Sequence, residues 1–320
     1  MARSTNLFSS IARLLLPMIL LIIVVFIGAS VWLVYQMAHV PSSGYLMTPD
    51  KYGRLSARAA QITEESWTNP DGSTTKGWLL RGAENAPAVI LYHKYGANRS
   101  YVLDMGVKLN ESTNFTILMP DIRAHGERGS DKHCTFGGCE VDDVTAAIQF
   151  LRGLRTSTEI SLVGKQIGIY GVELGSLYAL EGAAKDKSVK AIAVDSVPAD
   201  PNAMLASVVE HRYPFMSTIS SQMAVFGTYV YFYDGCYRRV STCETAKQID
   251  GRSVMLLGGL DAPEFQDSTA RLAKCLPQSN KITAKVDLSP SGYSIVGASL
   301  EQSEAYIQRI IEFFRSSLTE

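Results

Sequence analysis

The sequence predicts an α/β protein with a doubly wound, mostly parallel sheet, helices on both faces of the sheet and one N-terminal transmembrane helix. Three observations support this prediction. Short apolar runs, of the length of buried parallel strands, recur along the chain. Helical stretches alternate with these runs, as they do in parallel sheets with crossover helices. An uncharged run near the N-terminus has the length of a membrane span.

The uncharged run covers residues 14–34, and its 21 residues would span roughly 30 Å as a helix. Trp32 and Tyr35 lie near one end, where interfacial aromatic residues are found. A cleavable signal peptide is the alternative. The run is longer than the usual signal-peptide core, however, and no clear small-x-small cleavage site follows it. We therefore predict an uncleaved anchor in the lipid bilayer over residues 14–36, preceded by a cytoplasmic N-terminus at 1–13.

The distribution of charge predicts the orientation of this anchor. Arg3 and Arg13 precede the span without any acidic residue, whereas the first basic residue after it, Lys51, lies well beyond the membrane edge. The positive-inside rule therefore favours an extracytoplasmic C-terminal domain, which would be periplasmic in a Gram-negative bacterium. The formal net charge is −1 and no basic stripe is present, so we expect no nucleic-acid binding.

The five cysteines bear on the compartment. Two pairs each flank a short loop, Cys134 with Cys139 and Cys236 with Cys243. Local pairs of this kind predict disulfides, which are typical of an oxidising compartment, and leave Cys275 over. Five free thiols are the alternative. A zinc site that includes His133 would fit no common ligand spacing, and we predict neither a metal nor a cofactor.

After the anchor, residues 37–54 are polar and rich in turn-forming residues, which indicates a linker. The domain is predicted to cover residues 55–320. It begins with two strand-like runs, 57–62 and 76–80, on either side of the turn sequence Asn-Pro-Asp-Gly at 69–72. This arrangement predicts an initial hairpin.

The alternation of strands and helices follows. Strands are predicted at 88–92, 115–119, 166–170, 189–194, 254–257 and 282–288, and helices at 101–110, 140–154, 176–185, 265–275 and 300–318. The alternation stops between Asp195 and Ser253, which predicts a lid or cap insertion at about 197–252. Within it, residues 223–233 are dense in aromatic side chains. We favour packing inside the insertion for this stretch over a lipid- or acyl-binding surface.

The stretch Ile169–Gly175 is the centre of the prediction. A buried strand, a turn flanked by Gly171 and Gly175 and the start of a helix form the outline of a nucleophile elbow, Gly-x-Ser-x-Gly. Glu173 stands where the nucleophile belongs. Ser176 follows on the helix, and we interpret it as a residue of the first helical turn and not as a nucleophile.

Four motifs then occur in a specific order. They are His93-Lys94-Tyr95-Gly96, Asp121-x-Arg123-x-His125-Gly126, Gly171-x-Glu173-x-Gly175 and Gly258-Gly259-Leu260-Asp261. With these motifs, residues 75–318 resemble the α/β-hydrolase superfamily, and most resemble bacterial membrane-anchored members of the serine aminopeptidase and YqkD-like esterase group. The resemblance implies an oxyanion loop that includes Lys94 and Tyr95, with Leu174 directly after the elbow residue. It also implies that Asp261 is the acid of a catalytic triad.

The resemblance ends at the triad itself. Family chemistry needs a nucleophile, an acid and a histidine in that chain order, because the histidine takes the proton of the nucleophile. The five histidines of the chain are His39, His93, His125, His133 and His211. None follows Asp261, and the family histidine maps onto Tyr293. The nucleophile and the base are therefore both missing from their family positions.

The elbow lies at a helix N-terminus, where backbone N–H groups favour an anion. We therefore predict that the Glu173 carboxylate occupies the oxyanion hole, with Lys94 as its partner. The alternative is an ordinary surface or ion-pair contact. A carboxylate nucleophile would still lack the base that activates water to release the ester. We interpret His93 and His125 as structural residues of loops at the crevice.

Two functions remain as hypotheses. The first is a pseudoenzyme, a membrane-anchored degenerate hydrolase that binds an unknown small molecule or protein in its old active-site crevice. The second is an active hydrolase of the esterase or peptidase type with relocated catalytic groups. The fold alone does not discriminate between them.

Overall fold

The computed structural model of the protein describes residues 4–53, 60–126, 133–233 and 235–319. Arg3 and the start of the strand predicted at 57–62 lie outside this set. The chain divides into two compact units. One consists of Met1–Ala38 with Leu205–Gly235, and the other consists of His39–Met204 with Cys236–Glu320 and contains the whole sheet.

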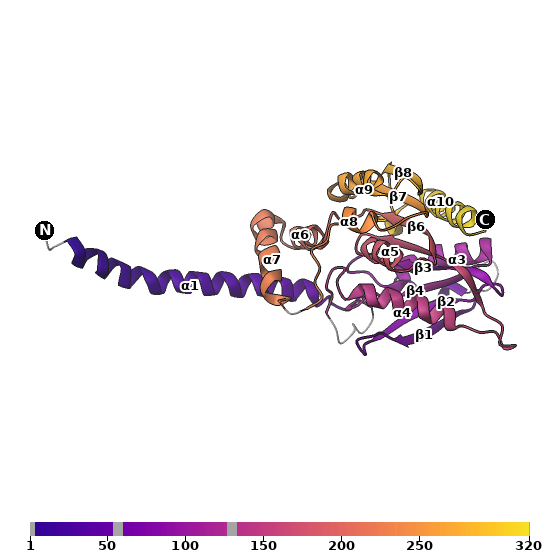
Figure 1. The fold of residues 1–320 in the computed structure, drawn as a ribbon, viewed down its shortest axis with the longest axis horizontal. Coiled ribbons are helices and arrows are strands. Elements are labelled where there is room, and N and C mark those ends of the chain that lie inside the picture. Colours follow the sequence, from indigo (N-terminus) through magenta and orange to yellow (C-terminus); the bar gives the residue numbers. More distant parts are fainter. Residues whose placement is uncertain (1–3, 54–59, 127–132, 234, 320) are drawn as a thin grey trace. The chain divides into compact units, whose positions relative to one another are not determined.

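The sheet of the larger unit has eight strands in the order β1-β2-β4-β3-β5-β6-β7-β8 (Figure 1). The strands are β1 (Ile62–Thr68), β2 (Thr74–Leu80), β3 (Ala86–Tyr92), β4 (Thr116–Pro120), β5 (Val163–Val172), β6 (Val189–Asp195), β7 (Ser253–Gly259) and β8 (Lys281–Leu288). β1 and β2 form an antiparallel hairpin, and β2 is antiparallel to β4. From β4 to β8 the neighbouring strands are parallel. The prediction of a mostly parallel, doubly wound sheet is confirmed.

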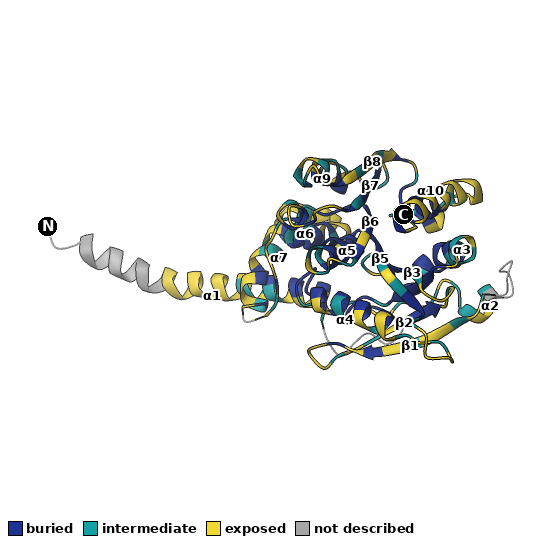
Figure 2. Ribbon diagram, turned by 45° about the vertical axis from the view of Figure 1, so that its right-hand side comes forward, coloured by how far each residue is buried: buried dark blue, intermediate teal, exposed yellow. Residues whose placement is uncertain are grey.

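Helices cover both faces of the sheet. The elements that pack on it are η1 (Arg99–Val102), α3 (Leu103–Thr113), α4 (Glu140–Gly153), α5 (Leu174–Lys185), α9 (Pro263–Cys275) and α10 (Leu300–Leu318). The short helix α8 (Thr242–Ala246) packs on α5 and α9. Helices α3 and α10 lie together on one face, and α4, α5 and α9 lie on the other (Figure 2). The remaining helical elements are α1 (Ser4–Ala38), α2 (Pro49–Gly53), α6 (Pro201–Arg212), η2 (Pro214–Met216), α7 (Ser217–Tyr231) and η3 (Ile295–Gly297).

The core lies on the central strands. The six residues of β5 from Ile167 to Val172 are all buried, which explains why this stretch has no polar alternation. Gly168 lies directly under the ring of Phe314 from α10, and a Cβ at this position would meet ring carbons 2.7 and 2.8 Å away. This close packing of helix on sheet fixes β5, and β5 in turn carries the elbow.

The smaller unit contains α1 packed against α7. Within α1, the 24 residues Leu15–Ala38 form a helix long and apolar enough to cross a membrane, and a signal sequence near an N-terminus has the same properties. Together with the disulfides described next, this helix indicates a secreted or membrane-anchored extracytoplasmic domain.

The predicted cysteine pairs are wrong, and so is the alternative of five free thiols. The disulfides join Cys139 to Cys236 and Cys243 to Cys275, and Cys134 is a buried free thiol. Because Cys139 is bridged, it is not free to be a ligand in the zinc alternative.

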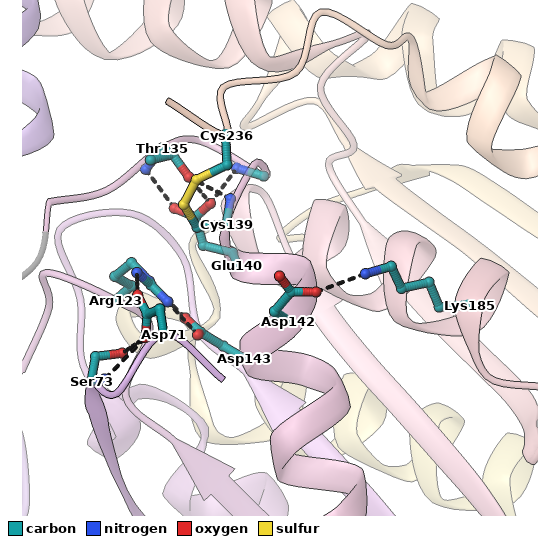
Figure 3. Close-up of a disulfide and its surroundings, with 11 residues drawn as sticks. Asp71, Ser73, Arg123, Thr135, Cys139, Glu140, Asp142, Asp143, Lys185 and Cys236 are labelled. Atoms are coloured by element: carbon teal, nitrogen blue, oxygen red, sulfur yellow. Dashed lines mark hydrogen bonds and ion pairs between the residues drawn. A yellow bond between two sulfur atoms is a disulfide. The ribbon is translucent and has the colours of Figure 1, made fainter. Parts of the chain in front are cut away.

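The local reason is the loop before α4, which the Glu140 side chain holds in place. The Glu140 carboxylate accepts hydrogen bonds from the backbone and hydroxyl of Thr135 and from the N–H of Gly137 (Figure 3). In this loop Cys134 is buried in the core, while Cys139 meets Cys236, whose backbone passes directly against Gly138. Cys243 on α8 meets Cys275 at the end of α9, with 5.3 Å between their Cα atoms.

Candidate active-site crevice

The elbow is a sharp, strained turn between β5 and α5. Glu173 has φ = 53° and ψ = −112°, in a region that residues other than glycine rarely adopt. Such a conformation costs about 1–3 kcal/mol and persists where the surrounding packing demands it. A Cβ at Gly171 would collide with the carbonyl of Gly175, and one at Gly175 would meet the carbonyl oxygens of Tyr92 and His93. Both glycines are therefore required by the close approach of the backbone.

The Glu173 side chain turns back onto the backbone and is buried. Its Oε2 accepts the N–H of Tyr95 at 2.6 Å and the N–H of Leu174 at 3.3 Å. Tyr95 belongs to the loop after β3, and Leu174 is the first residue of α5. Ser176 donates its hydroxyl to the carbonyl of Glu173 at 2.5 Å, so its side chain is engaged in the first turn of the helix.

The buried position of Glu173 changes its protonation. Burial raises the pKa of the Glu173 carboxyl to about 7, because it removes water from the charged form. The N–H groups of Tyr95 and Leu174 and the positive charge of Lys94 oppose this effect without cancelling it. The elbow therefore holds a carboxyl that is partly protonated at neutral pH.

Lys94 lies near this carboxyl but has another partner. Its Nζ donates to the carbonyl of Tyr293 at 2.9 Å and lies 4.0 Å from the centre of the Tyr293 ring. Among the described residues no ion pair within 4.0 Å joins Lys94 to Glu173, so the direct contact that we predicted is not formed. Burial lowers the pKa of Lys94, while the charges of Glu173 and Asp261 oppose this change. Lys94 therefore influences the pKa of Glu173 by its charge and not by a direct contact.

Asp261 follows β7 and points at the loop after β8. Its carboxylate accepts the N–H of Ser291 at 3.1 and 3.2 Å and the hydroxyl of Ser291 at 3.1 Å. Burial raises the pKa of the Tyr293 hydroxyl, and the charges of Glu173 and Asp261 add to this effect. The carboxyl ends of the strands thus bring together four side chains that are close enough for their charges to affect one another. These side chains are Glu173, Asp261, Tyr293 and Lys94.

Solved structures with a similar fold are found by comparison. An esterase from Pyrococcus furiosus has a TM-score of 0.63 over 88% of this chain and 99% of that protein, at 19% identity. The α/β hydrolase GrgF from Penicillium has a TM-score of 0.59 over 81% of this chain and 100% of that protein, at 15% identity. An acylaminoacyl peptidase from Pyrococcus horikoshii has a TM-score of 0.61 over 82% and 42%, at 15% identity. The chain has the α/β-hydrolase fold.

Sequence comparison adds two fungal relatives of this α/β-hydrolase-fold protein. A thiohydrolase of Aspergillus aculeatus is 25% identical over 131 residues, which are 41% of this chain and 40% of the relative. A polyketide transferase of Stachybotrys chlorohalonatus is 28% identical over 123 residues, 38% of this chain and 40% of the relative. The matched region therefore spans about two fifths of each curated relative. No protein-family model matches the sequence.

The two histidines placed at the crevice are buried and neutral in this α/β-hydrolase-fold protein. His93 donates Nδ1–H to the carbonyl of Lys94 and accepts the N–H of Ile122 at Nε2, so both nitrogens are occupied. His125 donates to the carbonyl of Arg123 and packs edge-on against Tyr95. Burial lowers the pKa of His93 to about 4 and that of His125 to about 3. Neither is therefore positively charged at neutral pH.

Sequence reasoning missed a buried network beneath the loop that carries Tyr293. Asp195, at the end of β6, accepts the N–H of Gly292 at 2.8 Å and the hydroxyl of Tyr306 at 2.6 Å. The Tyr306 hydroxyl also meets that of Tyr170 at 3.0 Å. These contacts position the loop after β8. An aspartate directly after the apolar run 191–194 was the available signal.

A second network holds the loop after β4, which carries His125. Arg123 forms a two-pronged pair with Asp143 on α4, and its third nitrogen contacts Asp71 in the β1–β2 turn (Figure 3). Arg123 and Asp143 are buried, and burial raises the pKa of Asp143 to about 6 despite the opposing effect of Arg123. The sequence identified Arg123 as part of a motif but did not identify its two partners.

Proposed function

We propose that this is a membrane-anchored α/β-hydrolase-fold protein that has lost serine-hydrolase chemistry and binds a ligand or partner in the former active-site crevice. One observation carries the proposal. The Glu173 carboxylate accepts hydrogen bonds from the N–H groups of Tyr95 and Leu174. In this fold the oxyanion hole is formed by the N–H of the residue after the nucleophile and an N–H of the loop after β3. Leu174 and Tyr95 have these two positions.

The occupied hole argues against acyl transfer. A substrate carbonyl would have to displace the Glu173 oxygen before these two donors could stabilise its developing negative charge. The loop after β8 carries Tyr293 in place of a histidine. Because burial raises the pKa of Tyr293, its hydroxyl stays protonated near neutral pH and cannot act as a general base. The Asp261 carboxylate is bound by Ser291 instead of by an imidazole.

The anchor is part of the same proposal. Residues 14–36 cross the bilayer once, with residues 1–13 in the cytoplasm and the sheet-containing domain outside it. Two disulfides support an oxidising compartment. On this proposal the protein is a non-catalytic member of the serine aminopeptidase and YqkD-like esterase group, which it resembles in motif order.

Activity assays of the full-length chain test this proposal. We expect aryl esters, thioesters and aminoacyl amides to be cleaved at the rate of buffer alone by the wild type and by Glu173→Ala. Glu181→Gln is the matched control, because Glu181 lies on α5, the helix that Glu173 precedes, and burial also raises its pKa to about 7. Turnover by the wild type that Glu173→Ala abolishes and Glu181→Gln retains would overturn the proposal.

One observation favours the alternative of an active hydrolase. The pKa of Glu173, about 7, lies where a general base or a carboxylate nucleophile works well at neutral pH. The same assay decides between the two functions, because only the alternative expects turnover that depends on Glu173.

Restoring the missing groups tests whether the three positions are equivalent to a triad. The variant Glu173→Ser/Tyr293→His places a hydroxyl and an imidazole on the two loops next to Asp261. We expect this double variant to hydrolyse an activated aryl ester at least about 100-fold faster than the wild type, because a nucleophile and its base act as a unit. Each single variant is expected to stay at the wild-type rate. A double variant that folds but remains inactive would contradict the assignment of these positions.

A further inference from the structure

A second uncharged stretch lies in the smaller unit. Residues 214–233 contain no acidic, basic or histidine side chain and include the whole of η2 and α7. Arg212 precedes the stretch, and Arg238 and Arg239 follow it. A surface helix of a water-soluble domain normally has a charged or polar outer face. Without charged side chains, this stretch suits an apolar environment better than water.

The stretch packs directly on the apolar helix α1. A Cβ at Gly227 would collide with the carbonyl of Ser30, so the two helix backbones approach as closely as a glycine allows. The rings of Phe26 and Phe226 have their centres 5.4 Å apart. Small residues at a close helix crossing are typical of helix pairs in membranes. Packing of α7 on α1 is thus of the kind found inside a bilayer.

Three hydroxyls of α7 are satisfied by backbone carbonyls of η2 and α7. The hydroxyls of Ser220, Ser221 and Thr228 donate to the backbone carbonyls of Met216, Thr218 and Val225 at 2.8, 3.2 and 2.7 Å. A membrane segment must satisfy its polar groups internally, because the hydrocarbon offers no hydrogen bonds. These hydroxyls would therefore not oppose burial of α7 in lipid.

The outer side of the stretch is mostly apolar, although Thr218 and Gln222 are also exposed on it. Phe215 is 98% exposed, and Met216, Ile219, Tyr229 and Val230 are also exposed large apolar side chains. Exposed apolar side chains of α1, from Leu15 to Phe26, continue this surface within the same unit. A contiguous apolar surface of this kind indicates a partner or a membrane. Because α1 is itself apolar enough to cross a membrane, we expect the same lipid environment to cover the exposed faces of both helices.

The contact between α7 and α1 also indicates how deep in the bilayer α7 would lie. It meets the second half of the span Leu15–Ala38, at Phe26, Ser30 and Tyr35. Trp32 and Tyr35 of α1 and Tyr229 and Tyr231 of α7 are the aromatic types that gather at a membrane interface. The stretch 214–233 is therefore placed near the interface where the chain leaves the bilayer.

We propose that residues 214–233 form a second membrane element, docked on α1 and embedded among the phospholipid acyl chains of the leaflet that holds the second half of α1. The inference rests on the proposed anchor, since α1 must remain in the bilayer. The occupant of the exposed apolar face is lipid. The insertion predicted as a lid would then carry a membrane element of its own. The chain would thus enter the membrane at α1 and again at 214–233.

Three matched isoleucines provide the test. Ile23, Ile219 and Ile160 are 47%, 57% and 42% exposed and lie on α1, on α7 and in the loop before β5. Each is replaced by cysteine in the full-length chain, where Cys134 is buried and the other four native cysteines are bridged. The variants Ile23→Cys, Ile219→Cys and Ile160→Cys are reconstituted in phosphatidylcholine–phosphatidylglycerol vesicles. A membrane-impermeant maleimide is then added, with and without detergent.

We expect the cysteines at 23 and 219 to react at least about 10-fold more slowly in vesicles than in detergent, and the cysteine at 160 to react at the same rate in both. Protection at 23 with free reaction at 219 would overturn the embedding of 214–233 and leave the anchor intact. Free reaction at both would overturn the anchor and, with it, this inference. If the cysteine at 160 is protected as strongly as those at 23 and 219, the vesicles shield the whole chain. Protection would then not be selective for 214–233, and the embedding would be rejected.

Discussion

Arg123→Ala is expected to lower the free energy of unfolding by about 3–5 kcal/mol, the loss typical of a buried ion pair that loses one partner. Arg123 donates to both oxygens of Asp143, at 2.8 and 2.5 Å, and to Asp71 at 2.7 Å. The Asp143 carboxylate is buried and would keep its position without a cation. Equilibrium urea unfolding of the full-length chain in mild detergent at neutral pH measures the loss.

An exposed pair provides the control for this experiment. Arg81 and Glu65 are joined at 3.0 Å but are both partly exposed, so Arg81→Ala is expected to cost less than about 1 kcal/mol. The double variant Arg123→Ala/Asp143→Ala also removes the carboxylate that has lost its cation. Its loss in free energy of unfolding should therefore be smaller than the sum of the losses of the two single variants. A loss for Arg123→Ala no larger than that for Arg81→Ala would show that the network does not hold the loop after β4.

Local patterns in the sequence predicted the fold and the elbow because their causes are local. A strand buried on both sides must be apolar along its length, as β5 is from Ile167 to Val172. Gly171 is needed because the carbonyl of Gly175, on the same turn, approaches where a Cβ would be. These requirements act on residues within a few positions of one another, so they can be recognised without knowing the partners of the chain.

Partners that are distant in sequence could not be predicted in this way. Cys139 pairs with Cys236, 97 residues away, although Cys134 is far nearer in sequence, because the loop before α4 buries Cys134. Asp261 binds Ser291 on another loop, and Asp195 binds Tyr306 on the last helix. Each contact depends on how two loops or layers meet, and no local pattern encodes that meeting.

The prediction for Glu173→Gln concerns stability as a function of pH. The Glu173 carboxyl has a pKa of about 7 in the folded protein against its usual 4.5, so the folded state binds the proton more tightly than the unfolded state. The stabilisation from this proton is complete below about pH 4.5 and is lost as the pH rises through 7. The difference corresponds to about 3 kcal/mol.

Glutamine does not titrate and retains one oxygen that can accept the N–H groups of Tyr95 and Leu174. The free energy of unfolding of Glu173→Gln, relative to the wild type, should therefore rise by about 3 kcal/mol between about pH 4 and about pH 8. Urea unfolding of both proteins at a series of pH values measures this change. Glu84→Gln is the control, because it removes an exposed carboxyl from a loop instead of a buried one. Parallel curves for Glu173→Gln would mean that the carboxyl titrates normally.

A raised pKa at this position also bears on what the crevice can bind. When Glu173 is ionised, its carboxylate already satisfies the two N–H donors and repels a second anion. When it is protonated, the same donors face a neutral group, and the nearby charge of Lys94 is no longer balanced by it. An anionic ligand should then bind more tightly below about pH 7 than above it, and Glu173→Gln should remove this dependence. If the pH dependence of stability is present in the wild type and absent from Glu173→Gln, the elbow carboxyl is the group that couples proton binding to the state of the crevice.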